Sequence, residues 1–469
     1  MNRRNFLALS TIAGGGLAFA FSPFLRRAEV FAEKGNLNNL RAVGYGELVP
    51  TAAKNTGETY LALPKGFEYN VLGKIDTPMS DGNKTPRRHD GMATFKVGNE
   101  LRIIRNHEVT NSSKPIPNSP IGANPYDEMA GGGTTTLVIN PKTREIVKDF
   151  VSLSGTLVNC AGGFTPWGSW ISCEETTLGK SIRTDSKGNQ TGGFAQPHGY
   201  CFEVFASANS SLTPVPLKAM GRFVHEAIAV DERTGIVYLT EDAGSAGFYR
   251  FLPKRNKRLA EGGILQMLKI KDQDAYDTRK GQKTGMSLMA NWVTIDKPDP
   301  IEADLDPGAV YKEGLSKGGA TFARLEGIWA DRKRRMYFTA TSGGDAKAGQ
   351  VWMYEATGKD EGRLTLIFES PSRQVLDMPD NICLPPKSDL VFICEDSDYA
   401  ELGGTPDNYV RILTPDGKIA DFAKNITEKR ESSEFAGTTF SRDGKTLFVN
   451  LQTIGATFAI WGDWNKFKS

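Results

Sequence analysis

Residues 159–175 read NCAGGFTPWGSWISCEE, and this stretch predicts a β-hairpin. Cys-Ala-Gly-Gly-Phe-Thr is expected to form the inner strand, Pro-Trp-Gly the turn, and Ser-Trp-Ile-Ser-Cys the return strand. An antiparallel pair brings its first and last residues side by side, so Asn159 and Cys160 would lie next to Cys173, Glu174 and the glutamate that follows. That end of the hairpin would hold a thiol and two carboxylates, which are candidate metal ligands.

The same pattern occurs six times along the chain. In each copy a polar, usually acidic, residue opens an apolar strand, a turn rich in Asp, Gly, Pro or Lys follows, and a second apolar strand ends near another polar residue. The copies begin at Asp90, Asn159, Glu226, Glu326, Asp380 and Glu434. Six similar hairpins in an all-β chain predict a six-bladed β-propeller, in which the innermost strand of each blade lines a central channel. Carboxylates far apart in sequence would then meet at one mouth of that channel.

The first 32 residues have the features of an export signal. Arg3 and Arg4 are the paired arginines of a twin-arginine signal, and a weakly apolar, glycine-rich run leads to Val30-Phe31-Ala32, a small-residue cleavage sequence. A membrane anchor is the alternative, but the apolar run is short. Because the twin-arginine route exports folded proteins, we expect a periplasmic or extracellular protein that has this export machinery as a partner and leaves the cytoplasm with its metals bound.

Residues 33–469 are expected to form a single β-propeller domain and a monomer. Residues 1–32 hold four arginines and one glutamate, so the remainder has a formal charge of −1, against +2 for the whole chain. A nearly neutral chain without a basic run argues against a nucleic-acid-binding surface. Residues 254–320 depart from the blade pattern and predict a long insertion, with a short helix near Met286–Asn291, that covers the channel.

The chain has five cysteines, an odd number that does not predict a disulfide framework. Cys201, Cys383 and Cys394 lie within apolar strand patterns, so we expect them to be buried. Cys160 and Cys173 are candidates for a pair across their hairpin. Cys173, which directly precedes two glutamates, is the better candidate for a metal ligand.

The predicted mouth of the channel collects many acidic side chains. Because like charges repel and burial penalises charge, so many carboxylates in a confined channel require cations between them. Oxygen-only groups favour calcium or magnesium, whereas a thiolate among carboxylates favours a transition metal such as iron. Any single acid would more often be a solvated strand end or a turn cap, and the shared position in six hairpins is what supports the group. The predicted metal ligands are Glu108, Cys173, Glu174, Glu175, Glu226, Glu241, Glu326, Asp380 and Glu395, with Asp242 and Glu434 as further candidates.

Arg324 is the predicted substrate-binding cation. It lies two residues before Glu326, on the same face of the strand. A guanidinium beside bound cations is suited to hold a phosphate group, although a salt bridge to a neighbouring glutamate is the alternative. Asn159 and Asn106 are candidates to donate amide hydrogens to the same ligand, unless they only tie backbone together.

Taken together, these motifs resemble the PhoX-type alkaline phosphatases. The resemblance rests on the paired arginines, Asn106-His107-Glu108, the NCAGG, TPWG and CEE segments, His225-Glu226, Arg324-Leu-Glu326-Gly and Phe440-Ser-Arg-Asp-Gly-Lys-Thr-Leu-Phe-Val. It implies a six-bladed propeller that carries an iron pair and calcium ions, with Cys173 as an iron ligand and Arg324 holding the phosphate. It also implies hydrolysis of small phosphomonoesters outside the cytoplasm at alkaline pH, by metal-assisted phosphoryl transfer without a serine nucleophile.

The chain departs from the family pattern in its first and last blades. Gln452-Thr-Ile-Gly-Ala stands where a Gln-His-Pro-Gly type of sequence is usual, and Arg87-Arg88-His89-Asp90-Gly-Met replaces an Asn-Asp-Phe type of start. Two other functions stay open: a calcium-dependent propeller lactonase or esterase, and a non-catalytic binding propeller that metals stabilise. Metal content and colour discriminate between them, because a thiolate-bound iron pair absorbs visible light.

Overall fold

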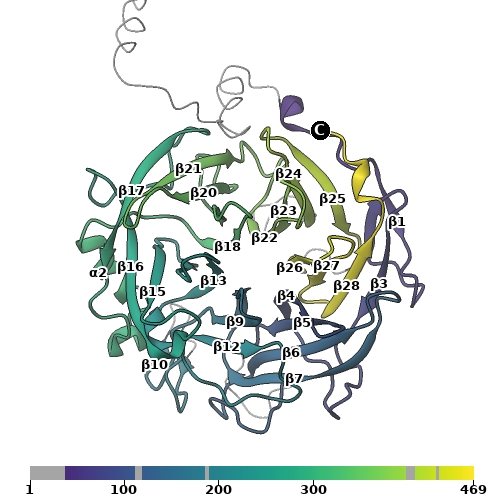
Figure 1. Cartoon of the computed structure of the whole chain (residues 1–469), viewed down its shortest axis with the longest axis horizontal. Coiled ribbons are helices and arrows are strands. Elements are labelled where there is room, and N and C mark those ends of the chain that lie inside the picture. Colours follow the sequence, from purple (N-terminus) through teal and green to yellow (C-terminus); the bar gives the residue numbers. More distant parts are fainter. Residues whose placement is uncertain (1–36, 111–118, 185–187, 189, 398–406, 429–432) are drawn as a thin grey trace, which may run out of the picture.

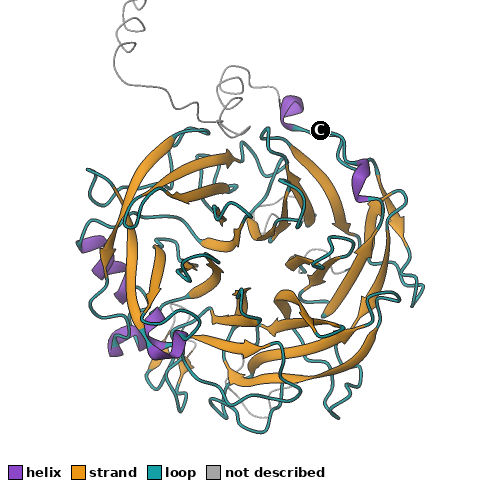
Figure 2. Cartoon of the chain, in the orientation of Figure 1, coloured by secondary structure: helices purple, strands orange, loops and turns teal. Residues whose placement is uncertain are grey.

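The computed structural model describes residues 37–110, 119–184, 188, 190–397, 407–428 and 433–469. The signal predicted for residues 1–32 lies outside this part of the chain. Strands dominate the described residues, and they surround a central axis in an all-β, propeller-like arrangement (Figure 1). Helices are short and lie at the outer edge (Figure 2). None of the helices in the described residues is long and apolar enough to span a membrane.

Six inner strands form a ring around the axis. They are β4 (His89–Val97), β8 (Asn159–Phe164), β13 (His225–Val230), β18 (Leu325–Ala330), β22 (Pro379–Cys383) and β26 (Phe435–Phe440). Each strand contacts the next, and β26 contacts β4, so the ring is closed. Glycine permits this close approach, because a Cβ atom on Gly91 would lie 2.5 Å from the Cα of Ala161.

Each inner strand is the first strand of a hairpin, as the sequence pattern predicts. The hairpin predicted from residues 159–175 is confirmed. The second strands are β5 (Glu100–His107), β9 (Ser169–Glu174), β14 (Val237–Glu241), β19 (Met336–Ala340), β23 (Val391–Glu395) and β27 (Leu447–Leu451). They run back to the mouth at which the inner strands begin, so the start and end of every hairpin meet there.

Outer strands extend these hairpins into larger sheets. One four-stranded sheet continues from β5 through β6 (Gly132–Ile139) to β7 (Ile146–Thr156), and a three-stranded sheet adds β12 (Cys201–Phe205) to β9. The sheet of β26 and β27 continues through β28 (Ala456–Trp461) to β3 (Glu68–Leu72), so a C-terminal strand pairs with an early strand, as predicted. The six-stranded sheet adds β24 (Tyr409–Leu413), β25 (Ile419–Asn425), β2 (Leu61–Pro64) and β1 (Leu48–Thr51) to β23.

The two hairpins that begin at β13 and β18 belong to one nine-stranded sheet. It contains β15 (Phe248–Pro253), β16 (Gly263–Ile270), β17 (Ser287–Thr294), β20 (Gln350–Ala356) and β21 (Gly362–Glu369). Strand β17 pairs with β16 on one side and with β21 on the other, so the described strands do not form six separate sheets. The sheet folds back on itself, because the rings of Phe248 and Phe338 stack 4.4 Å apart between β15 and β19.

The segment 254–320 lies at the outer edge of the molecule (Figure 1). It supplies β16, β17, η4 (Ile301–Asp304) and α2 (Ala309–Ser316). The prediction that this insertion covers the channel is therefore wrong, since its strands continue the blade sheet outward. The helix predicted near Met286–Asn291 is also wrong, because strands β16 and β21 offer hydrogen-bond partners to both edges of β17. The remaining small elements are β10 (Ile182–Thr184), β11 (Gln190–Gly192), η1 (Leu37–Leu40), η2 (Lys218–Met220), η3 (Leu259–Glu261) and η6 (Trp464–Lys466).

Candidate metal centre

Every inner strand carries a β-bulge at the mouth where it begins. In β8, Asn159 pairs with Glu174 and Gly162 with Ser172, so Cys160 and Ala161 together face a single residue of β9. The same shift of register occurs in all six hairpins. A bulge bends the strand and re-aims a side chain. In five of the hairpins the first residue of the bulge is a potential metal ligand: Asp90, Cys160, Glu226, Glu326 and Asp380.

Three of these side chains and a neighbour form a first group of donors. One ligand atom each from Cys160, Glu175 and Glu226 lies within 4.8 Å of the other two. The Cys160 Sγ is 3.4 Å from Oε1 of Glu226, while Oε2 of Glu226 is buried without a hydrogen-bond partner in the described residues. Burial, and then the nearby carboxylates, raise the pKa of both glutamates and of the thiol. A cation at this point would compensate the buried charge.

A second group of donors adjoins the first and shares Glu226 with it. Ligand atoms of Glu226, Glu326 and Asp380 also lie within 4.8 Å of one another. Burial raises the pKa of Glu326 and Asp380 strongly, and neighbouring acids raise it further. The two groups therefore provide adjacent positions for two cations, with one carboxylate able to contact both.

Two pairs of acids flank these groups. The side-chain amide of Gln452 donates to Oδ2 of Asp90 and to Oε2 of Glu108, both at 2.7 Å. Burial raises the pKa of Asp90 to about 8 and that of Glu108 to about 7. In the second pair, burial and the adjacent Asp396 raise the pKa of Glu434 well above its ordinary value. The sequence departs from the family pattern at Gln452. This residue thus directly contacts Asp90 and Glu108, the first of the two pairs.

Arg324 lies at the edge of this acidic cluster and is already paired. Its Nε donates to both carboxylate oxygens of Asp242, at 3.0 and 3.3 Å, and its Nη2 donates to Asp242 and, at 2.6 Å, to Glu326. The salt bridge considered as the alternative is therefore present. Glu326 and Asp242 raise the pKa of the guanidinium, which stays charged. No hydrogen bond from Nη1 to another described residue is present, so this nitrogen is available to an external oxyanion.

Asp90, Asp396 and Cys160 are the site residues that the predicted ligand set omits. Asp90 opens its hairpin in the way that Glu226 and Asp380 open theirs, so its position in the repeat identifies it. Asp396 follows β23 in the way that Glu175 follows β9 and Asp242 follows β14, so its position in the repeat is the signal that identifies it. Cys160 can be identified as a candidate ligand only when the bulge is known, because a regular hairpin would place Cys173 at the mouth instead.

Three predicted ligands brace their own blades instead of facing the cluster. They are Glu174, Glu241 and Glu395, the last residues of β9, β14 and β23. Each accepts backbone N–H groups where the third strand of its sheet begins, from Gly199 and Tyr200, from Gly247, and from Tyr409, respectively. Successive residues of a strand point to opposite faces, so the residue after each of these glutamates turns toward the mouth.

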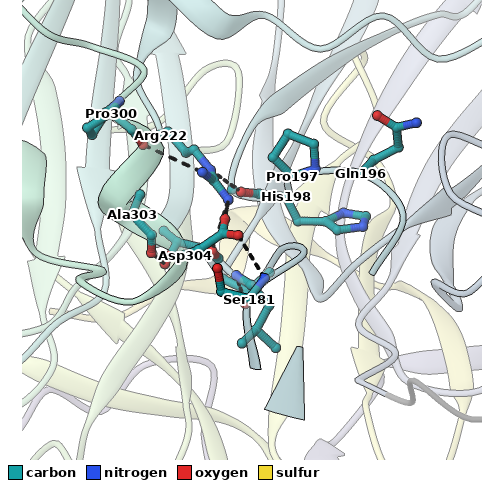
Figure 3. A network of polar contacts seen from close by, with 12 residues as sticks. Ser181, Gln196, Pro197, His198, Arg222, Pro300, Ala303 and Asp304 are labelled. Atoms are coloured by element: carbon teal, nitrogen blue, oxygen red, sulfur yellow. Dashed lines mark hydrogen bonds and ion pairs between the residues drawn. The ribbon is translucent and has the colours of Figure 1, made fainter. Parts of the chain in front are cut away.

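Glu174 adjoins a network in which Arg222 connects His198 with Asp304 of the segment 254–320 (Figure 3). Its Oε1 accepts a 2.6 Å hydrogen bond from Nδ1 of His198, and the backbone oxygen of His198 accepts one from Arg222. Arg222 pairs with Asp304, whose carboxylate also accepts from the backbone of Ser181. Burial lowers the pKa of His198, but the adjacent Glu174 and Asp127 outweigh this effect and raise the pKa to about 9. A charged imidazolium therefore completes the network.

Cys173 and Asn159 also point away from the cluster. The Cys173 Sγ is buried in an apolar cluster, 3.6 Å from the Sγ of Cys201. All five cysteines are free, so the pairing considered for Cys160 and Cys173 is not formed. Asn159 uses its side-chain amide for structure, since it donates to Ser172 in its own sheet and accepts from Thr156 at the end of β7 in the neighbouring sheet. Neither side chain therefore lies at the mouth where it could bind a metal ion or a substrate.

Asn106 has the structural role that the sequence analysis gives as its alternative, since it ties backbone segments together and does not contact a ligand site. Its Nδ2 donates to the backbone oxygens of Cys160, at 3.0 Å, and Ala161, at 2.7 Å. Its Oδ1 accepts from Trp170 and Ser172. Asn106 thereby fixes the bulge that carries Cys160 from the neighbouring sheet.

Comparisons with known proteins agree with this geometry. A family model described as alkaline phosphatase PhoX matches residues 43–455, which is most of the chain. None of the curated protein sequences compared with the chain matches it. Among solved structures, that of Pseudomonas fluorescens PhoX in complex with vanadate, a transition state analogue, is similar with a TM-score of 0.65 and 18% sequence identity. The match covers 91% of this chain and 98% of that one, and at this identity it establishes the fold.

Proposed function

The chain belongs to the PhoX family of alkaline phosphatases, and we propose that the acidic cluster at the mouth of its ring is the metal centre at which it hydrolyses phosphomonoesters. The observation that carries this proposal is the pair of donor groups that share Glu226. Seven acids with raised pKa values are held within one mouth, four of them buried and three half-buried, and Oε2 of Glu226 has no partner in the described residues. Burying so many carboxylates lowers the stability of the folded protein unless cations compensate their charge.

The donor set indicates which ions would fit. We assign Cys160, Glu175 and Glu226 to an iron ion, because a thiolate among carboxylates suits a transition metal. Glu226, Glu326 and Asp380 offer only oxygen, and we assign them the second iron because they share Glu226 with the first group and the family resemblance implies an iron pair. The oxygen-only pairs, Asp90 with Glu108 and Asp396 with Glu434, suit calcium. This assignment replaces Cys173 by Cys160 and removes Glu174, Glu241 and Glu395 from the ligand set.

Arg324 is the residue of the chain that we propose to hold the phosphate. Asp242 and Glu326 fix two of its nitrogens, so the guanidinium is oriented before a substrate arrives. Its Nη1 carries two N–H groups that can donate to phosphate oxygens, and its charge stabilises negative charge that builds up in the transition state. The bound cations would supply Lewis-acid polarisation of the phosphate oxygens. Asn159 does not contact the substrate in this proposal, because its side-chain amide is already bonded to Ser172 and Thr156.

The fold that carries the site is interpreted as a six-bladed propeller. Six inner strands form the closed ring, and each begins a hairpin with the same bulge. The stacking of Phe248 on Phe338 supports division of the nine-stranded sheet into two blades that β17 joins at their outer edges. Residues 33–469 would then be one domain, and we propose that it acts as a monomer.

Export by the twin-arginine route is part of the proposal. It rests on the sequence of residues 1–32 and on a centre that collects donors from strands far apart in the chain. Such a centre forms only after folding, so metals loaded in the cytoplasm require export of the folded protein. The protein would then act in the periplasm or outside the cell.

Metal removal tests the function. The exported protein is assayed with p-nitrophenyl phosphate before and after chelation, and again after iron and calcium are returned. We expect chelation to abolish hydrolysis and the two metals together to restore it. Full activity of the metal-free protein would contradict the proposal, and restoration by calcium alone would favour a calcium-dependent esterase.

A further inference from the structure

The opposite mouth of the ring forms a second cavity, a funnel of about 1020 Å³. Five of the six inner hairpins contribute turn residues to its lining, and the sixth contributes the last residues of β4. Asp90 and Lys96 mark the two ends of β4 and are six residues apart, so the mouths are separated by roughly 20 Å at the rise of a β-strand. This funnel, which we call the turn-side funnel, is thus distinct from the acidic cluster.

A narrow waist separates the two mouths. It lies between the inner strands, has a volume of only about 40 Å³, and is lined largely by glycine and apolar residues such as Gly91, Ala161 and Ile228. A space of this size holds only a few water molecules and no nucleoside-sized ligand. A molecule bound in the turn-side funnel therefore cannot reach the acidic cluster through the ring.

Aromatic rings form the floor of the turn-side funnel. Phe164 and Trp329 come from β8 and β18, which are not neighbours in the ring, and their rings meet with centroids 5.1 Å apart. Phe164 is 37% exposed although it lies at the centre of the fold. An exposed aromatic floor inside a concave site offers a stacking surface to a planar ring.

Cations surround this floor. Five basic residues line the turn-side funnel against three acids, and one of the basic residues, Arg334, already pairs with Asp231 at 3.2 Å. One of the acids, Asp331, is likewise neutralised by Arg335. The side chains of four cations have no ion pair or hydrogen bond with the described residues: Lys96, Arg332, Lys333 and Arg442. Unpaired guanidinium and ammonium groups at a rim attract phosphate.

We propose that the turn-side funnel is a second, non-catalytic binding site for a phosphate ester that carries a planar ring, of the nucleoside phosphate class. The ring stacks on Phe164 and Trp329, and the phosphate is held by Arg332 and Lys333. The cavity volume matches that of sites for small organic ligands. Because the waist is closed, the ligand is bound here without being hydrolysed.

Calorimetry with α,β-methylene-ADP, which a phosphomonoesterase does not cleave, tests the proposal on the metal-loaded enzyme. The Arg324→Ala variant serves as the background, because it weakens binding at the acidic cluster. We expect this variant to keep one binding event. Arg332→Glu together with Lys333→Glu is expected to weaken that event at least about tenfold, since charge-assisted hydrogen bonds are lost. In an otherwise wild-type enzyme the same double change leaves hydrolysis of p-nitrophenyl phosphate unchanged.

Two further variants make the test specific. Lys65→Glu with Lys142→Glu introduces the same charge change in exposed turns elsewhere and is expected to leave binding unchanged. Phe164→Ala is expected to weaken binding of α,β-methylene-ADP about tenfold and to leave binding of inorganic phosphate unaltered. The proposal is overturned if the Arg324→Ala variant shows no binding event, or if the double variant at 332 and 333 binds as tightly as the control.

Discussion

The Sγ of Cys160 lies 3.4 Å from Oε1 of Glu226, although 66 residues separate them. They meet because β8 and β13 are neighbours in the ring and because each strand has its bulge at the same level. Without the bulge, the alternation of a regular strand would direct other side chains to the mouth. A local backbone irregularity that repeats in every hairpin thus assembles the centre.

Replacement of the two cysteines should separate a ligand from a core residue. Cys160→Ala is expected to lose the thiolate-bound metal and to reduce activity more than about 100-fold. Cys173→Ala should keep metal and activity and cost about 1 kcal/mol of stability, since it only leaves a small cavity. Elemental analysis, visible absorption and thermal denaturation check both variants. Loss of iron from Cys173→Ala, with iron retained in Cys160→Ala, would reverse the assignment.

Arg324→Ala should weaken phosphate binding without removing metal. Loss of a charge-assisted contact of about 1.5–3 kcal/mol predicts a rise of about 10- to 150-fold in the inhibition constant of inorganic phosphate. Arg324→Lys is the matched control and should recover only part of this loss, because a single ammonium nitrogen cannot pair with Asp242 and Glu326 and also present a fixed pair of N–H groups to phosphate. Inhibition constants and metal content are measured together. Unchanged inhibition in the alanine variant would exclude a role in holding phosphate.

Glu395→Gln should affect stability and not metal binding. Its carboxylate accepts from Nε of the buried Arg411 at 2.8 Å, and Arg411 keeps its second partner, Asp421, so we expect the substitution to cost about 1.5–3 kcal/mol of stability. Asp380→Asn provides the opposite case, since it removes one of several repelling charges and should stabilise the metal-free protein while weakening metal binding. Chemical denaturation with and without metal distinguishes the two. Metal loss from Glu395→Gln at unchanged stability would restore this residue to the ligand set.

The metal-free protein should lose stability as the pH rises from about 4 to 8. Asp90 and Glu108 have pKa values raised to about 8 and about 7, from ordinary values of 3.8 and 4.5. A raised pKa means that the folded state binds protons more tightly than the unfolded chain, so this stabilisation is complete at low pH and disappears as the folded-state groups ionise. Bound cations compensate the charges, and the gain in melting temperature on adding metal should therefore be largest near pH 8. A melting temperature of the metal-free protein that stays level or rises between pH 5 and 8 would contradict this.

The hairpin repeat predicts much of the fold from the sequence. Alternation and turn residues identify the hairpin at residues 159–175, and the acids at its ends indicate a shared mouth. The bulge cannot be recognised from alternation, because it adds one residue without changing composition, and the sequence pattern therefore favours Cys173 over Cys160 as a ligand. The bracing role of Glu174 depends on backbone groups of Gly199 and Tyr200, which only the tertiary fold brings near.

Anomalous diffraction at the iron absorption edge, on crystals of the exported protein, tests the central claim most directly. The account predicts two neighbouring iron peaks, one among Cys160, Glu175 and Glu226 and the other among Glu226, Glu326 and Asp380. Loss of the first peak in crystals of the Cys160→Ala variant would confirm that Cys160 is a ligand of that iron. An active enzyme whose crystals show no iron at this mouth, or show it beside Cys173, would contradict the account.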